Sequence, residues 1–266
     1  MSKRLVVIQA RRGSSRLPDK VMMPILGKPL LHRMVERVLM ARSDFEFVVA
    51  TTQEPQDDAI AALCAENNWP CYRGHSTDLL DRHYQAALQF NAEVVLKIPS
   101  DVPLIDPVVI DEVIGYFQNY EGQFDYVSNL HPATWPDGND VEIMTFSALK
   151  TAWEEAQKPL EREHTTPFFW ENPERFRIGN VLCSSGKDFS MTHRFTIDYL
   201  EDYNFIKAVF EALYPSNPAF GLSEILHLLD EHPEIYEINA KFAGVNWYRN
   251  HLDELKTITE QQTKQI

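Results

Sequence analysis

Residues 4–20 read RLVVIQARRGSSRLPDK, a short apolar run followed at once by a basic loop. The run from Leu5 to Ile8 is typical of a strand buried on both faces. Gly13 lies in the loop and permits a tight turn whose backbone N–H groups can face an anion. Parallel sheets bind ligands beyond the carboxyl ends of their strands, so this stretch predicts such a sheet and its first binding loop.

Strand-like and helical patterns alternate through the rest of the first half. We expect strands at 45–50, 70–73, 93–98 and 125–128, and helices at 30–40, 57–67, 79–90 and 107–119. In the less regular second half we expect strands at 141–145, 177–182 and 194–197, and helices at 146–157, 161–170, 201–213, 222–230 and 246–258. The alternation predicts an α/β fold, a mainly parallel sheet with helices on both faces. We expect one domain over residues 1–250 with an inserted smaller subregion, and a C-terminal helix end and polar tail at 251–266.

The charge of the chain is strongly acidic, with 25 Lys and Arg against 39 Asp and Glu and a formal net charge of −14. A general nucleic-acid partner is therefore not expected, because phosphate neutralisation needs a basic face. A small anionic substrate remains compatible, because cations gather near the N-terminus. They are Lys3, Arg4, Arg11, Arg12, Arg16, Lys20 and Lys28, with Asp19 as the one acid in this stretch.

The three cysteines, Cys64, Cys71 and Cys183, show no CxxC spacing. A disulfide framework or zinc site is not expected, and reduced thiols suit a cytoplasmic protein. The apolar run at 5–8 is too short for a signal peptide, and no later run approaches the roughly 18 apolar residues of a membrane span. The sequence predicts a cytoplasmic protein that has no membrane partner.

The loop after the first strand has two readings. Arg11, Arg16 and Lys20 provide fixed positive charge, and guanidinium groups match phosphate oxygens. Composition alone is equally compatible with a solvated basic loop. The position after a parallel strand favours a triphosphate-binding loop, although the Walker spacing G-x-x-x-x-G-K-[ST] is absent.

The run IQARRGSSRLPDKVMMPILGKPLL (8–31) resembles the opening motif of the cytidylyltransferases that activate acidic sugars, and it is most similar to their SpsF-type branch. The similarity continues in family order through VVATT (48–52), DLLDRHYQAA (78–87), SDVPLIDP (100–107), DYVSN (125–129), PDGNDVEI (136–143), EREHTTPF (161–168) and RFTIDYLEDY (194–203). The resemblance implies the nucleotide-diphospho-sugar transferase fold, which is Rossmann-like. It also implies transfer of CMP from CTP to an ulosonic-type sugar acid, release of pyrophosphate, and a homodimer.

The resemblance also implies roles for individual residues. Nucleotide contacts are expected from Ala10, Arg11, Gly13, Ser14, Arg16, Lys20, Thr51, Asp81, Arg82 and Asp101. Catalytic roles fall on Arg11, Lys20, Asp101 and Asp198, with Mg²⁺ held by Asp101 and Asp198. Independently, Mg²⁺ prefers carboxylate oxygens supplemented by water and phosphate, and both aspartates follow expected strands. Alternatively, Asp101 is a turn residue and Asp198 caps the next helix.

Two positions in the opening motif depart from the family pattern: Arg12 stands where a neutral residue is usual, and Asp19 where glycine is common. Arg12 could extend recognition toward a more anionic acceptor. On the acceptor side the candidates are Asp140, Glu142, Arg162 and His164; an exposed acidic turn and a locally paired helix end are equally good readings. His131 has no ligand-like spacing and receives no role. The stretch from Phe168 to Trp170 is expected to be packing or dimer core.

Three other readings stay open. The chain could use another nucleoside triphosphate or a phosphorylated acceptor. It could be a nucleotide-binding subunit without catalysis, although the basic loop and both aspartates argue against that. A glycosyltransferase is disfavoured because no D-x-D motif ends a strand.

Overall fold

A seven-stranded sheet runs through the computed structural model, which describes residues 2–266. Its strands are β1 (Arg4–Gln9), β4 (Glu46–Thr52), β5 (Cys71–Gly74), β6 (Val94–Pro99), β7 (Tyr126–Ser128), β8 (Glu142–Thr145) and β9 (Ile178–Asn180), in the order β5-β4-β1-β6-β8-β7-β9. Neighbouring strands are parallel except that β8 is antiparallel to β6 and β7. A short hairpin, β2 (Pro24–Ile25) and β3 (Lys28–Pro29), lies outside this sheet. The predicted mainly parallel α/β fold is confirmed.

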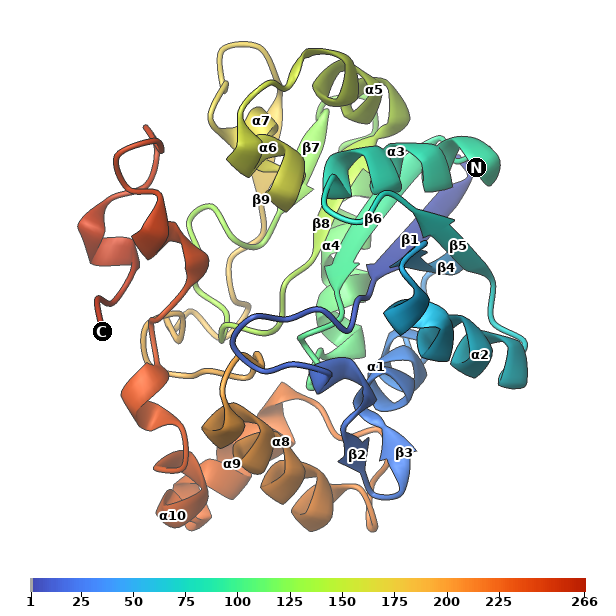
Figure 1. Cartoon of the computed structure of the whole chain (residues 1–266). Coiled ribbons are helices and arrows are strands. Elements are labelled where there is room, and N and C mark those ends of the chain that lie inside the picture. The colour runs from blue at the N-terminus through green and yellow to red at the C-terminus, as the bar shows by residue number, and fades with distance from the viewer. Residues whose placement is uncertain (1) are drawn as a thin grey trace.

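Helices cover both faces of the sheet (Figure 1). One face carries α1 (Leu30–Val38), α2 (Asp58–Glu66) and α4 (Pro107–Asn119), and the other carries α3 (Leu79–Gln89), α5 (Phe146–Glu155), α6 (Pro159–His164) and α7 (Pro167–Trp170). Successive side chains of a strand point to opposite faces, so Val6 and Ile8 of β1 join the first core and Leu5 and Val7 the second. No helix within residues 2–266 has the length and apolar character needed to cross a membrane.

A third apolar cluster forms around α8 (Leu200–Leu213), α9 (Leu222–Glu231) and α10 (Pro233–Tyr236). Phe205 and Phe210 of α8 belong to it together with Ile25 of β2 and Leu30 of α1. These helices therefore pack beside the β2–β3 hairpin at the lower end of the molecule in Figure 1. This packing brings the segment that precedes α8 close to the loop that follows β1.

Two expected elements in the second half are wrong. Residues 194–197 form no strand, and Arg194 makes only an isolated parallel bridge with Asp137. The single helix expected over 161–170 is two short helices, α6 and α7. They are separated at Thr165, which has φ 72°, and Pro167 cannot donate the backbone hydrogen bond that a continuous helix needs.

The α-helix expected at 246–258 is also wrong. The segment contains a 3-10 helix, η4 (Trp247–Asn250), followed by turns, and a second one, η5 (Glu260–Gln262), follows. Tertiary contacts override the helical pattern: the Glu171 carboxylate accepts bonds from the backbone N–H groups of Lys256 (2.6 Å) and Thr257 (2.9 Å). Leu255 and Ile258 are buried in the second core. The C-terminal part thus runs back from α10 along one side of the molecule, red in Figure 1.

Candidate functional site

Two adjoining cavities open beyond the carboxyl ends of β1 and β6. The basic cavity, about 300 Å³, is lined by Arg11, Arg16, Lys20 and Arg82 among others. The aromatic cavity, about 400 Å³, includes Trp135, Trp170, Trp247 and Tyr248. Seven residues line both cavities and form their shared wall: Gln9, Arg16, Lys97, Asp101, His164, Asp198 and Trp247. A ligand in one cavity can therefore reach a ligand in the other across this wall.

The loop after β1 is held by an internal ion pair. The Arg12 guanidinium donates to Asp19 Oδ2 at 2.9 Å, and the Arg12 backbone N–H donates to Asp57 Oδ1 at 2.8 Å. Asp19 has φ 64°, in the left-handed region that glycine adopts without strain, which explains why glycine suits this position. The two departures from the family pattern thus pair with each other. Arg12 does not line either cavity, and its contact with the acceptor stays a prediction.

Asp101 and Asp198 converge on one cation, the buried Lys20 ammonium. Lys20 Nζ donates to Asp101 Oδ2 at 3.1 Å, to Asp198 Oδ1 at 3.1 Å and to the Ile197 carbonyl at 2.5 Å. Burial opposes the charge of Lys20 most strongly, yet the two carboxylates raise its pKa above the usual value. The structure thus brings the two predicted aspartates together although 96 residues separate them in sequence, because Asp101 follows β6 and Asp198 precedes α8.

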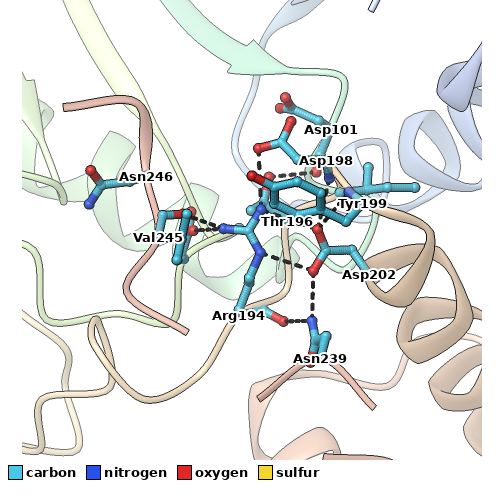
Figure 2. Close-up of polar contacts among 12 residues, drawn as sticks. Asp101, Arg194, Thr196, Asp198, Tyr199, Asp202, Asn239, Val245 and Asn246 are labelled. Carbon is cyan, nitrogen blue, oxygen red and sulfur yellow. Dashed lines mark hydrogen bonds and ion pairs between the residues drawn. The ribbon is translucent and has the colours of Figure 1, made fainter. Parts of the chain in front are cut away.

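A buried arginine fixes the position of Asp198. Arg194 donates to Asp202 Oδ1 at 2.9 Å, to Asp198 Oδ2 at 3.2 Å and to Asp137 Oδ2 at 3.1 Å, as Figure 2 shows in part. It also donates to the Val245 carbonyl at 2.5 Å, which ties the C-terminal segment to the site. Although burial acts in the opposite direction, the cations around Asp198 lower its pKa to about 2. Asp198 is therefore a carboxylate at neutral pH.

The paired carboxylates fit a divalent cation. Within residues 2–266 no three His, Cys, Asp or Glu side chains are arranged to hold a metal ion. Mg²⁺ does not require three, because it commonly takes one or two carboxylates and completes its octahedron with water and substrate phosphate. Asp101 and Asp198 offer hard oxygens that already converge on one positive charge, and both face the basic cavity. These two donors fit a magnesium ion whose remaining positions are filled by water and a phosphate ligand.

The aromatic cavity is walled mostly from the second half of the chain. Trp247 stacks on His164 with ring centroids 3.8 Å apart, and Trp170 stacks on His131 at 4.4 Å. Burial lowers the pKa of His164 to about 3 and that of His131 to about 4. Both rings are therefore neutral at physiological pH, and they add apolar surface to the wall instead of positive charge.

The charged groups of the aromatic cavity are mainly carboxylates. Lys97 forms an ion pair with Glu142, and the Tyr126 hydroxyl donates to the other oxygen of Glu142 at 2.5 Å. Asp137 is bonded to Arg194, while among residues 2–266 Asp140 accepts only from the backbone N–H of Gly138, at 3.1 Å. Burial raises the pKa of Asp140 to about 6.

The structure gathers most of the predicted site residues. The basic cavity contains Ala10, Arg11, Ser14, Arg16, Lys20, Arg82, Asp101 and Asp198, and the aromatic cavity contains Asp140, Glu142 and His164. Neither cavity is lined by Gly13, Thr51, Asp81 or Arg162. Gly13 has no side chain, and the other three side chains make their contacts elsewhere. Thr51 is fully buried in β4, Asp81 accepts from Trp153 Nε1 at 2.8 Å, and Arg162 donates to Asp78 at 2.8 Å. Direct contact of these four residues with a ligand stays a prediction.

Several residues of the cavities were not predicted. Lys97 carries a detectable signal, because it is the one charge within the apolar strand VVLKIP. Arg194 carries a weaker one, with acids four and eight residues further on. His131, to which no role was assigned, and Trp170, which was expected to serve packing or the dimer core, both line the aromatic cavity. Nothing in the sequence indicates that Trp247 and Tyr248 return to the site from the C-terminal segment.

Comparisons with known proteins agree with this arrangement. The model of the cytidylyltransferase family matches residues 5–242. The spore coat polysaccharide biosynthesis protein SpsF of Bacillus subtilis is 28% identical over 245 residues, covering 88% of this chain and 97% of that protein. A 3-deoxy-manno-octulosonate cytidylyltransferase of Chlamydia trachomatis is 29% identical over 182 residues, covering 63% of this chain and 68% of the enzyme.

A solved structure supports the same assignment. A cytidylyltransferase from Leptospira borgpetersenii superposes with a TM-score of 0.83 at 31% identity, covering 89% of this chain and 97% of that one. The family match spans the loop after β1 and both aspartates, and it stops just before the segment that carries Trp247. By sequence and by fold, the chain belongs to the cytidylyltransferase family.

Proposed function

We propose that this chain transfers CMP from CTP to an acidic sugar of the ulosonic type, with Mg²⁺ as cofactor and pyrophosphate as the second product. The observation that carries the proposal is the shared wall, where Asp101, Asp198 and Arg16 face both cavities. A nucleotide in the basic cavity and an acceptor in the aromatic cavity would meet at this wall. Holding two reactants in the geometry of reaction supplies much of the rate enhancement in transfers of this kind.

The triphosphate belongs in the basic cavity. Arg11, Arg16 and Lys20 face it, and a triphosphate brings the negative charge that these side chains require. Arg82 is buried, and its guanidinium donates to the backbone carbonyls of His75 (2.7 Å) and Ser76 (2.9 Å). We therefore assign Arg82 to shaping the cavity, and we assign Arg11, Arg16 and Lys20 to neutralising the departing pyrophosphate.

Asp101 and Asp198 would hold the Mg²⁺ ion. When bound, the ion acts as a Lewis acid on the α-phosphate. Lys20 then exchanges its carboxylate partners for phosphate oxygens, because it is the cation that both carboxylates contact now. This exchange keeps Lys20 charged throughout, and its carboxylate contacts already raise its pKa.

The charges of the aromatic cavity argue against a phosphorylated acceptor. Each of its cations is already paired with a carboxylate: Arg16 with Asp198, Lys97 with Glu142, and Arg194 with Asp202. A phosphate deep in this cavity would face carboxylates and two neutral histidines. A single carboxylate fits better at the shared wall, where Arg16 and Lys97 lie. Aromatic rings suit the apolar faces of a sugar ring.

The names of two relatives support the pathway. One is a spore coat polysaccharide biosynthesis protein and the other activates 3-deoxy-manno-octulosonate. We accordingly propose a place in the synthesis of a surface polysaccharide or glycan, and a homodimer as the working state. Light scattering coupled to gel filtration tests the oligomeric state directly.

The decisive experiment measures pyrophosphate release from CTP and Mg²⁺ with a panel of sugar acids. Release with at least one sugar acid is expected, and Asp101→Ala should lower it by orders of magnitude while the circular dichroism spectrum is unchanged. Turnover with UTP or GTP but not CTP would contradict the base preference. Nucleotide binding without release, with every acceptor, would instead identify a non-catalytic subunit.

A further inference from the structure

The carboxylates of the aromatic cavity differ in whether a cation neutralises them. Most of them have a partner within ion-pair distance, in the pairs Lys20–Asp101 (3.1 Å), Arg16–Asp198 (2.7 Å), Arg194–Asp137 (3.1 Å) and Lys97–Glu142. Asp188 lies at the exposed rim and is bonded to Ser190. Asp140 is the one inner carboxylate of this cavity that forms no ion pair within residues 2–266. Without such a pair, the burial of the Asp140 carboxylate raises its pKa; burial also raises the pKa of Asp137, in spite of its pair with Arg194.

The position of Asp140 is fixed by the turn that carries it. Gly138 donates its backbone N–H to Asp140 Oδ1 at 3.1 Å. The next residue, Asn139, accepts from the Asp106 backbone N–H at 2.9 Å through its side chain, and its carbonyl accepts from Asn129 Nδ2 at 2.6 Å. Asn139 is 1% exposed. The turn is thus anchored on two sides, so Asp140 presents its second oxygen from a rigid support.

We propose that Asp140 is the general base that deprotonates the acceptor hydroxyl, a role that rests on the proposed CMP transfer. The proton passes from the hydroxyl to the free carboxylate oxygen of Asp140. The hydroxyl oxygen forms its bond to the α-phosphorus as the bond between that phosphorus and the pyrophosphate oxygen breaks. Pyrophosphate leaves with the electron pair toward Lys20 and Arg16, and Asp140 later returns the proton to solvent.

The charges that face Asp140 suit this role. After burial, the groups that raise its pKa are Asp101 and Glu142, while Lys97 and the Gly138 N–H lower it; the result is about 6. The carboxylate is therefore mostly ionised at pH 7, yet it holds a proton far better than an ordinary aspartate. Such a balance between ionisation and basicity is what general base catalysis near neutral pH requires. Below pH 6 the base becomes protonated and turnover should fall.

The first test compares the full chain with its Asp140→Asn variant, using CTP, Mg²⁺ and the best acceptor of the panel. Loss of the base should lower kcat by about 10²- to 10⁴-fold, and the dissociation constant of CTP measured by calorimetry should not change. The acid limb of the kcat–pH profile, with its midpoint near 6, should disappear from the residual activity. Asp253→Asn is the matched control, because Asp253 is exposed and lines neither cavity, so this variant should keep the acid limb.

Two outcomes separate this inference from the proposed function. Pyrophosphate release that survives in Asp140→Asn at the wild-type kcat, with the acid limb intact, overturns the inference and leaves the transfer reaction standing. A second readout needs no turnover: the ¹³C carboxyl resonance of Asp140, assigned by its loss in Asp140→Asn, is titrated in the full chain. A midpoint near 6 supports the inference, and one near the ordinary aspartate value of about 4 overturns it even if no acceptor is turned over.

Discussion

Replacing Arg194 with methionine should strongly destabilise the fold, because this one side chain neutralises carboxylates that the protein has buried. The Arg194 side chain is 1% exposed, and its main partner, Asp202, is 0% exposed. Removing one member of a buried ion pair costs about 3–5 kcal/mol, since the other charge is left uncompensated. In this variant Asp202 would still accept hydrogen bonds from the backbone N–H groups of Asp198 (2.9 Å) and Tyr199 (3.0 Å). The Val245 carbonyl would lose the hydrogen bond that Arg194 donates to it. We therefore expect a loss of about 4 kcal/mol, within the range for such pairs.

Urea denaturation followed by circular dichroism measures this loss as a change in the free energy of unfolding. Lys207→Met is a matched control, because Lys207 and Glu211 form an exposed pair, 49% and 53% exposed, and such pairs contribute about 1 kcal/mol or less. The double variant Arg194→Met with Asp202→Asn should lose less than the sum of the two single variants, because the uncompensated charge is gone. A loss below about 1 kcal/mol in Arg194→Met would refute the reasoning, since it would match a surface ion pair.

Three further predictions address other parts of the site. The lowered pKa of Asp198, about 2 against a usual 3.8, contributes stability that is fully present above pH 4 and is lost as the pH falls toward 2; Asp198→Asn should flatten this part of the unfolding free energy measured against pH. Gly138 has φ 112°, and a Cβ there would lie 2.5 Å from a backbone atom, so Gly138→Ala should lower the melting temperature; Gly115→Ala, which meets no atom within 4 Å, should leave it equal or higher. Tyr248 lines only the aromatic cavity and His251 only the basic cavity. In steady-state kinetics, Tyr248→Phe should therefore raise the KM for the acceptor by about threefold to tenfold, for the loss of one hydrogen bond, and His251→Ala should raise the KM for CTP. The reverse pattern would contradict the assignment of the two cavities.

The part of the site that sequence could predict follows local rules. The loop after β1 and Asp101 after β6 were located because parallel strands bring their carboxyl ends to one edge of the sheet. Arg16 and Lys20 share that edge, and the structure places all three on the basic cavity. Such a prediction needs only the succession of strands and loops along the first half of the chain, where the structure has β1, β4, β5 and β6 close to the expected ranges.

Burial and pairing could not be predicted in the same way. Arg162 is paired with Asp78, a partner 84 residues away, and Arg12 is paired with Asp19 within its own loop. Sequence shows which residues carry charge, but the partner of each charge is set by tertiary packing. The same limit explains why the sequence presents Asp140 only as one acid of an acidic turn. Its lack of an ion pair becomes visible in the structure, where every other inner carboxylate of the cavity has a cationic partner.

The C-terminal segment separates what the family shares from what this chain adds. The family match ends at residue 242, yet both cavities are completed by residues beyond it, among them Trp247, which stacks on His164. The basic loop and the paired aspartates, to which the proposed function assigns the nucleotide and the magnesium ion, lie inside the matched region. The aromatic cavity depends on the unmatched segment, which Arg194 holds through the Val245 carbonyl. The family model therefore covers the proposed nucleotide site, whereas part of the proposed acceptor site lies outside the matched residues.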